Sequence, residues 1–359
     1  ALWGEAGRAA WADLPPWLRP MMLLAPAAAL LAYAMCAAQT LQHVDEIRRG
    51  AATLRHDRAV QIVALPAVYG VMAMGALTRM YQLKTGRFEE EHAADHLTLE
   101  ERRQLYLSKS ETCFWVGDLY EAWALYQFGQ LTLELIRSSV HRMQHSEVQE
   151  KREAARALTA AYGAVESIAW LGIWLFLVVC VLQAGWSCYL LTFAAPLADF
   201  SRYNARMAQF TAAGMVASAG AIYNVHVVES TFHEYLEGYR PLLKFITVKI
   251  IVSFAFFQRG TINMFSAFQE TLPWIMQRVV AKAPMLGDII NMNEVDFDLF
   301  YSSLLLLECV LIAALHWLAW RASEPWYAET EADGVPGGSA EKDETSPLLA
   351  ARTGARSCA

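Results

Sequence analysis

Charged side chains are scarce in this sequence. Asp, Glu, Lys and Arg make up 18% of its 359 residues, whereas soluble domains carry roughly 25%. Basic charge is not in excess, because 29 Lys and Arg stand against 36 Asp and Glu, which gives a net charge of −7. A nucleic-acid partner bound through a basic surface is therefore excluded. Six cysteines without a Cys-x-x-Cys pair also exclude a small secreted domain held by disulfides.

Short catalytic and nucleotide-binding motifs are missing as well. The sequence contains no Gly-x-Ser-x-Gly, no His-Glu-x-x-His, no Gly-x-x-x-x-Gly-Lys-Ser/Thr loop and no Gly-x-Gly-x-x-Gly. It also lacks a recognisable internal repeat, so the inverted-repeat architecture of many secondary transporters has no support. We therefore predict a protein that is not an enzyme and that uses no cofactor.

Long apolar stretches are what the sequence does have, since 55% of its residues are hydrophobic. A transmembrane helix needs ~20 mainly apolar residues. We predict an all-α, polytopic membrane protein with seven transmembrane helices in one bundle. The predicted spans are residues 21–42, 59–82, 112–136, 162–184, 207–233, 241–266 and 299–320.

These spans divide the chain into three parts. The parts are an N-terminal segment at 1–20, a membrane domain at 21–322 with a charged insert at 84–111, and a disordered acidic tail at 323–359. We expect the insert to form a loop and then a short solvated helix, which begins at a capping box of Thr98 and Glu101. Lys and Arg gather after the first and third spans, which predicts a cytosolic C-terminus and an external or lumenal N-terminus.

Ionisable side chains inside a span are costly, so each is a candidate functional residue. The spans hold Asp118, Tyr120, Glu121, Lys244, Lys249, Glu308 and His316. Asp118 and Glu121 are three residues apart and share a helix face. We predict that Lys244 or Lys249 pairs with one of these two carboxylates or with Glu308. If Lys244 lies near the interface, its long side chain can extend toward it more easily than that of Lys249. The alternative is a network that only joins helices.

Three polar residues near the end of the fifth span share another helix face. His226, Glu229 and His233 have the offsets 0, 3 and 7, a spacing that can hold a divalent metal ion. The alternative, which we favour, is a polar stripe where the helix leaves the membrane. We therefore predict no metal site there.

The acidic tail contains one short motif. Glu344 precedes the pair Leu348 and Leu349 by four positions, and this pattern resembles an acidic dileucine sorting signal. Such a signal is read in the cytosol, which agrees with the predicted orientation.

Several motifs in the predicted spans resemble the family of organic solute transporter alpha and transmembrane protein 184. They are Ala64-Leu-Pro66-Ala-Val-Tyr69, Asp118-Leu-Tyr120-Glu121-Ala122, Arg240-Pro241-Leu-Leu-Lys244-Phe245-Ile-Thr-Val248-Lys249 followed by Phe256-Phe-Gln258, and Glu308 with Ala314-Leu-His316. The resemblance covers roughly residues 30–322. The insert at 84–111 departs from the family pattern, and so does the lack of a cysteine-rich stretch after the third span.

The resemblance implies a protein that moves amphipathic organic solutes, such as sterol or bile-acid-like compounds, by facilitated diffusion. It implies an endosomal, vacuolar or plasma membrane, and as partners membrane lipids, the solute, and a small single-span beta-type subunit or a second copy of the chain. An anionic solute would suit Lys244 or Lys249, and Gln258 joins the candidate polar network. The alternative is a non-transporting trafficking or signalling protein of an endosomal or vacuolar membrane.

Overall fold

The computed structural model describes residues 5–50, 53–87, 98–145, 149–194, 200–232, 236 and 239–327. These residues form helices and connecting turns, without a strand among them, which confirms the all-α prediction. The helices are α1 (Glu5–Asp13), α2 (Leu18–Arg48), α3 (Thr53–Val63), α4 (Leu65–Lys84), α6 (Leu99–Gln144), α7 (Gln149–Tyr189), α8 (Phe200–Phe232), α9 (Pro241–Thr271), α10 (Pro273–Lys282), α11 (Pro284–Ile290) and α12 (Glu294–Ala319). A π-helical turn (Leu190–Ala194) follows α7, and a 3₁₀ turn (Pro325–Tyr327) follows α12.

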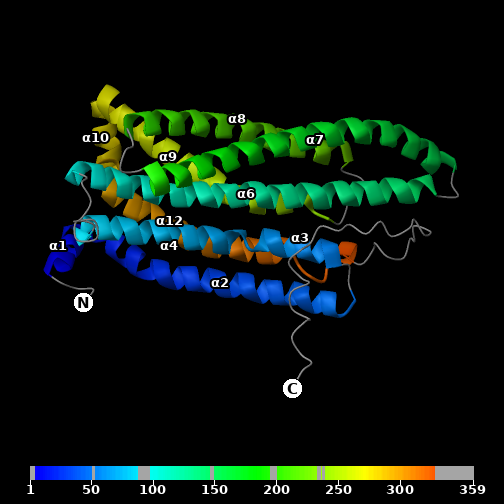
Figure 1. The fold of residues 1–359 in the computed structure, drawn as a ribbon, viewed down its shortest axis with the longest axis horizontal. Helices are drawn as coiled ribbons and strands as arrows, with labels where there is room; N and C mark the ends of the chain where they lie inside the picture. The colour runs from blue at the N-terminus through cyan, green and yellow to red at the C-terminus, as the bar shows by residue number, and fades with distance from the viewer. Residues whose placement is uncertain are drawn as a thin grey trace, which may run out of the picture.

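The long helices lie side by side along the longest dimension of the molecule (Figure 1). Helix α6 contacts α4 on one side and α7 on the other, α7 contacts α8, and α12 contacts α2, α4 and α9. Helices α1 and α10 lie at one end of the bundle, and the start of α3 lies at the opposite end. Helix α6 therefore lies between α4 and the pair of α7 and α8, and α9 packs against α6 and α12.

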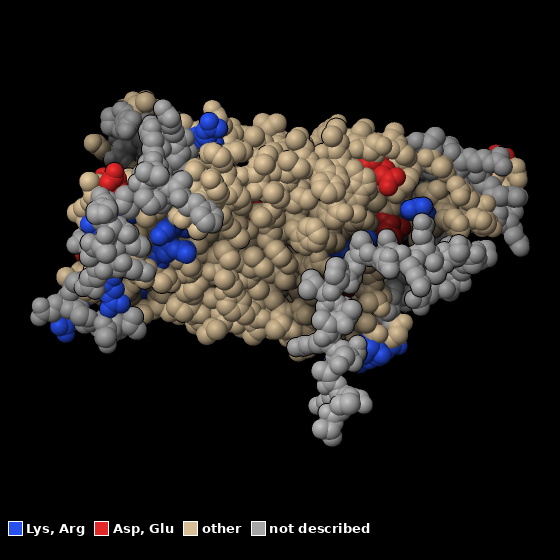
Figure 2. All heavy atoms as spheres, viewed as in Figure 1, with Lys and Arg blue, Asp and Glu red and all other residues tan. Residues whose placement is uncertain are grey.

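Five helical segments are long and apolar enough to cross a membrane. They are Leu18–Arg48, Thr53–Lys84, Tyr162–Thr192, Ala205–Phe232 and Glu294–Ala319. They correspond to the first, second, fourth, fifth and seventh predicted spans, whereas the crossing of α6 and α9 stays a prediction. Figure 2 shows charged side chains toward both ends of the face in view and a broad uncharged band between them, as expected for a bundle in lipid.

The second candidate span consists of two helices, α3 and α4. Pro66 occupies the first turn of α4, where its missing N–H removes no intrahelical bond. The N–H of Val68 still donates to the carbonyl oxygen of Ala64 at 3.0 Å. The two helices therefore follow each other as one candidate span.

Helix α6 begins with the predicted capping box. The Thr98 hydroxyl accepts from the N–H of Glu101 at 3.3 Å, and the Glu101 carboxylate accepts from the N–H of Thr98 at 2.7 Å. This hydrogen bond lowers the pKa of Glu101 below its ordinary value.

The prediction of a separate short helix in the insert is wrong. Helix α6 runs unbroken over 46 residues, because its first 18 residues contain neither proline nor glycine to end the charged turns before the apolar ones begin. At 1.5 Å per residue it extends about 69 Å, more than twice the ~30 Å of a hydrocarbon core. Residues 88–97 of the insert lie outside the described residues.

The predicted start of the tail is also wrong. Residues 325–327 form a helical turn in which Trp326 and Tyr327 are buried, because aromatic side chains there pack onto the bundle. The rest of the tail, with the sorting motif at Glu344, Leu348 and Leu349, lies outside the described residues.

Helices α7 and α8 approach closely at Gly172. A Cβ atom at this position would lie 2.1 Å from Nδ2 of Asn224. That amide nitrogen donates to the carbonyl oxygen of Ile168 at 2.8 Å. A small residue therefore allows a side-chain hydrogen bond between the two helices, an arrangement that is typical of helix pairs in membranes.

Replacing Gly172 by Ala should lower the thermal unfolding temperature of the purified protein in detergent, at a cost of about 1–3 kcal/mol for overpacking. The matched control is Gly163→Ala in the same helix, where an added Cβ meets no atom within 4 Å. The control should unfold at or above the wild-type temperature. Equal unfolding temperatures for the two variants would contradict the close α7–α8 contact.

Candidate functional site

A buried ion pair joins α6 and α9 in the middle of the bundle. Nζ of Lys249 lies 2.9 Å from Oε1 of Glu121 and 3.1 Å from Oγ of Ser218 on α8. The ring centroid of Phe176 on α7 lies 4.1 Å from the same nitrogen. Glu121 is 0% exposed and Lys249 is 4% exposed. The predicted pairing of a span lysine with a span carboxylate is confirmed for Lys249.

Asp118 lies one turn before Glu121 on α6 and has a different partner. The hydroxyl of Tyr69 on α4 donates to Oδ1 of Asp118 at 2.6 Å. The Tyr69 ring reaches this position because Gly117 has no side chain, and a Cβ there would lie 2.8 Å from Cε1 of the ring. The shared helix face predicted for Asp118 and Glu121 is confirmed, because both line one cavity.

Lys244 pairs with a carboxylate that lies outside the predicted spans. Its Nζ lies 2.7 Å from Oε2 of Glu324 and donates to the carbonyl oxygen of Tyr239 at 2.7 Å. The ring centroids of Tyr239, Trp320 and Trp326 lie 4.7, 5.5 and 5.4 Å from this nitrogen. Lys244 is 0% exposed. Of the two lysines, only Lys249 therefore has a predicted span carboxylate as its partner. Glu324 and the three aromatic rings hold the ammonium group of Lys244 inside the protein.

An unusual backbone conformation supports this arrangement. Arg240 has φ = 54° and ψ = 56°, in the left-handed region that non-glycine residues rarely adopt. The conformation turns the chain into α9, and the carbonyl group of Tyr239 then lies close to Lys244. Burial also raises the pKa of the Tyr239 phenol above its ordinary value, so the ring stays neutral beside the ammonium group.

We define residues 320–327 as the clasp, because they cover the helix ends around Lys244. Arg55 on α3 donates to the carbonyl oxygen of Trp326 and lies 3.1 Å from Glu134 on α6. The ring of Tyr327 stacks on His56, with centroids 4.1 Å apart. The sequence signal that could have revealed the clasp is the density of Trp and Tyr around Glu324.

The remaining predicted residues have other partners. Glu308 accepts from Nε2 of Gln258, and Tyr120 donates to the carbonyl oxygen of Gln61 at 2.8 Å. Nδ1 of His316 lies 2.9 Å from the carbonyl oxygen of Ile312 in its own helix. The contacts of the described residues therefore place the predicted network in separate groups, of which only Lys249 and Glu121 form a lysine–carboxylate pair of span residues.

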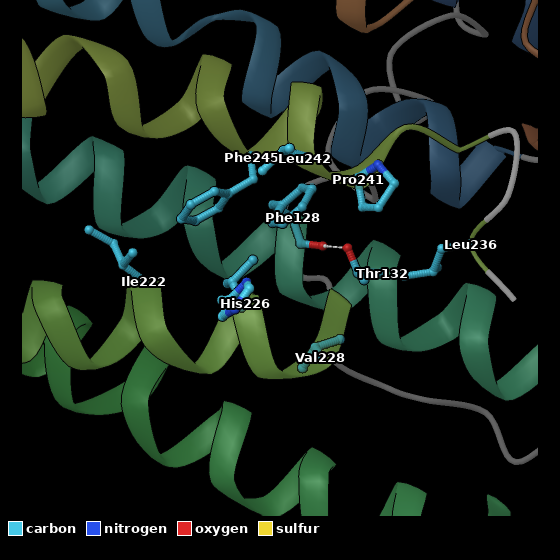
Figure 3. A pocket seen from close by; sticks show the side chains of 10 residues that line it. Phe128, Thr132, Ile222, His226, Val228, Leu236, Pro241, Leu242 and Phe245 are labelled. Atoms are coloured by element: carbon cyan, nitrogen blue, oxygen red, sulfur yellow. Dashed lines mark hydrogen bonds between the residues drawn. The ribbon is translucent and has the colours of Figure 1, made fainter. Parts of the chain in front are cut away.

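Two cavities lie along α6 and α8, and Glu121 lines one of them. The apolar cavity, about 240 Å³, is lined by Phe128, Thr132, Ile222, Val225, His226, Val228, Leu236, Pro241, Leu242 and Phe245. Figure 3 shows side chains from α6, α8 and α9 around this space. The inner cavity, about 20 Å³, is lined by Trp115, Asp118, Glu121, Phe176, Cys180, Gln183, Thr211, Gly214 and Ser218. The inner cavity is large enough for about one water molecule.

The two cavities follow each other along the same helix faces. On α6 the lining residues run from Trp115 through Glu121 to Thr132, a rise of about 26 Å, close to the ~30 Å of a hydrocarbon core. On α9, Phe245 of the apolar cavity precedes Lys249 by one turn. The ion pair therefore lies between the two cavities.

The predicted polar stripe and its metal alternative are only partly visible. His226 lines the apolar cavity, whereas the side chain of Glu229 and all of His233 lie outside the described residues. Within the described part of the chain, no group of three His, Cys, Asp or Glu side chains is placed to hold a metal ion.

Replacing one partner of the Lys249–Glu121 pair should destabilise the folded protein more than replacing both. Glu121→Gln or Lys249→Met alone leaves an uncompensated buried charge, which costs roughly 3–5 kcal/mol. The double variant leaves no uncompensated charge and should regain much of the folding stability that each single variant loses. Thermal unfolding in detergent measures the three variants, and a double variant whose loss equals the sum of the single losses would contradict the pair.

The clasp can be tested with trypsin, because Arg321 within it is exposed. Glu324→Gln removes the counter-charge of Lys244, so the clasp should open more often and cleavage after Arg321 should be faster than in the wild type. The matched control is Glu294→Gln, which removes an exposed carboxylate at the other end of α12. Unchanged cleavage in Glu324→Gln would contradict the role of this pair.

Comparison with known proteins adds one positive finding. Residues 104–325 match the model of the family described as organic solute transporter Ostalpha. No curated protein and no solved structure matches the chain. The matched residues include both lysine pairs, the two cavities and most of the clasp, and they make up more than half of the chain. The chain, a multi-pass membrane protein, therefore belongs to the organic solute transporter Ostalpha family.

Proposed function

We propose that this protein carries amphipathic organic solutes of sterol or bile-acid type across a membrane by facilitated diffusion. The observation that supports this proposal is the row of two cavities along α6, α8 and α9, with the Lys249–Glu121 pair between them. In this account the cavities mark the solute path, and the ion pair is its gate.

The apolar cavity suits the apolar body of such a solute. Its described lining has only two polar side chains, Thr132 and His226, which could each form a hydrogen bond with a solute hydroxyl group. The cavity holds about 240 Å³, less than the ~300 Å³ at the lower end of ligand pockets. A sterol-sized body therefore requires α8 and α9 to move apart.

The ion pair closes the path in this conformation, because the inner cavity holds about 20 Å³ and leaves no room for an organic solute. An anionic group that reaches Lys249 can replace Glu121 as its partner. The exchange keeps the buried ammonium group paired throughout, so it avoids much of the cost of separating two charges in a low-dielectric interior. Such a gate favours anionic over neutral solutes.

The proposed transport also bears on the membrane topology and the surroundings of the protein. We propose that α6 and α9 also cross the membrane, which gives seven spans with an external or lumenal N-terminus and a cytosolic C-terminus. Exposed apolar side chains on α7, among them Leu171 and Val178, are 72% and 46% exposed and suit contact with lipid, with a single-span subunit or with a second copy. An endosomal, vacuolar or plasma membrane fits the proposal. A trafficking role rests on the tail motif alone and is less favoured.

A substitution that fills the apolar cavity tests the proposed path and leaves Lys249 and Glu121 unchanged. Val225→Phe fills part of the apolar cavity and should reduce the uptake of a radiolabelled steroid sulfate into proteoliposomes about tenfold, which corresponds to roughly 1.4 kcal/mol in the barrier. The matched control is Val216→Phe on the same helix, where the side chain is 73% exposed and faces away from the path. The control should transport at the wild-type rate. Wild-type uptake by folded Val225→Phe would contradict this path.

A further inference from the structure

A third hollow lies near the other end of α6, beyond the inner cavity. It holds about 530 Å³ between α4, α6 and the end of α7, within the range of ~300–1,000 Å³ that is typical of ligand sites. We refer to it as the charged hollow. Its described lining is Met72, Arg79, Gln82, Tyr106, Lys109, Thr112, Cys113, Val116, Cys188, Leu191 and Thr192.

Two cations line the charged hollow, Arg79 from α4 and Lys109 from α6, and no carboxylate is among its described lining residues. Nη1 of Arg79 lies 2.6 Å from Sγ of Cys113, a neutral acceptor. By contrast, Lys84 one turn further along α4 is paired with both Asp13 and Asp296 at 2.7 and 2.9 Å. Arg79 therefore offers a half-buried guanidinium group to the hollow and has no ion-pair partner among the described residues.

The rest of the lining is divided by polarity. Met72, Val116 and Leu191 supply apolar contact area, and Gln82, Thr112 and Thr192 supply hydrogen-bonding groups. Arg79 is five residues from the end of its candidate span, about 7–8 Å along the helix axis, and so near the depth of the headgroups. A ligand that fits has an anionic head beside the two cations and an apolar body along the helices.

We propose that the charged hollow is a binding site for an anionic amphipath, whose phosphate, sulfate or carboxylate head lies between Arg79 and Lys109. A guanidinium group binds such heads through two parallel hydrogen bonds. The ligand is either a phospholipid of the membrane or a solute from the aqueous phase, since both have this chemistry. The proposal stands apart from the proposed transport, because binding here requires no movement past the ion pair.

Cys188 provides a reporter, because it lines the hollow and is exposed. The experiment measures the rate of maleimide labelling of Cys188 by mass spectrometry, on Cys358→Ala protein in a neutral maltoside detergent. Dodecyl phosphate should slow the labelling about tenfold at saturation. Dodecanol, which has the same chain without the charge, and inorganic phosphate, which has the charge without the chain, should not. Equal labelling with and without dodecyl phosphate would overturn the proposal.

Variants of the two cations test whether dodecyl phosphate protects Cys188 by binding in the charged hollow. Arg79→Gln and Lys109→Gln should each weaken protection by dodecyl phosphate, and two separate variants keep the test usable if one of them fails to fold. The matched control is Arg206→Gln, which removes an exposed cation near the start of α8, where its guanidinium stacks on Trp186 at 5.5 Å outside the hollow. Protection that survives in both hollow variants, or that is lost equally in the control, would overturn the assignment.

A second arm distinguishes the two sources of the ligand. In phosphatidylcholine vesicles, slower labelling of Cys188 after phosphatidylglycerol is included identifies a membrane lipid as the ligand. Slower labelling with added dodecyl phosphate, but not with phosphatidylglycerol, identifies a solute from the aqueous phase. Either result supports the site, and labelling that neither compound slows contradicts it. Steroid sulfate uptake by Val225→Phe is measured separately and is unaffected by these outcomes.

Discussion

The cost of burying charge in an apolar bundle is the constraint on which the rest of this structure depends. Lys249 and Glu121 are almost fully buried, and each makes the other tolerable. Their contact fixes α9 against α6, with Ser218 of α8 and the ring of Phe176 of α7 completing the surroundings of the ammonium group. Side chains from four helices thus meet at the ammonium group of Lys249, and along α6 and α8 one cavity lies on each side of this contact.

The charge of the second buried lysine, Lys244, is stabilised by different groups. Lys244 uses a carboxylate beyond the end of α12, a backbone carbonyl group and three aromatic rings. The clasp supplies the carboxylate and two of the rings, whereas Tyr239 supplies the carbonyl group and the third ring. Through Lys244 and Arg55 the clasp joins α9 and α3 to the end of α12. We infer that Lys244 is chiefly structural, since its partner belongs to the clasp, whereas Lys249 lies beside the cavities that form the proposed path.

The sequence predicted what depends on composition and local spacing. Long apolar stretches predicted the five candidate spans among seven, and the Thr98–Glu101 spacing predicted the capping box. The cost of an unpaired lysine predicted that Lys244 or Lys249 pairs with a span carboxylate, as Lys249 does with Glu121. The continuation of α6 from the insert into the span was missed because the change from charged to apolar residues suggested a helix boundary, although no proline or glycine interrupts residues 99–116. The partner of Lys244 was missed because Glu324 lies in a short segment after the last predicted span, where no helical periodicity indicates which residues face the bundle. The cavities depend on how side chains from several helices fit together, which no single segment determines.

The central claim is that the Lys249–Glu121 pair is the gate of a path for anionic amphipaths. The most direct measurement is steroid sulfate uptake by proteoliposomes that contain the double variant Glu121→Gln and Lys249→Met, which has no uncompensated charge and should remain folded. Our account predicts that uptake falls about tenfold or more, because the anion loses its partner inside the bundle. Uptake at the wild-type rate by the folded double variant would contradict it.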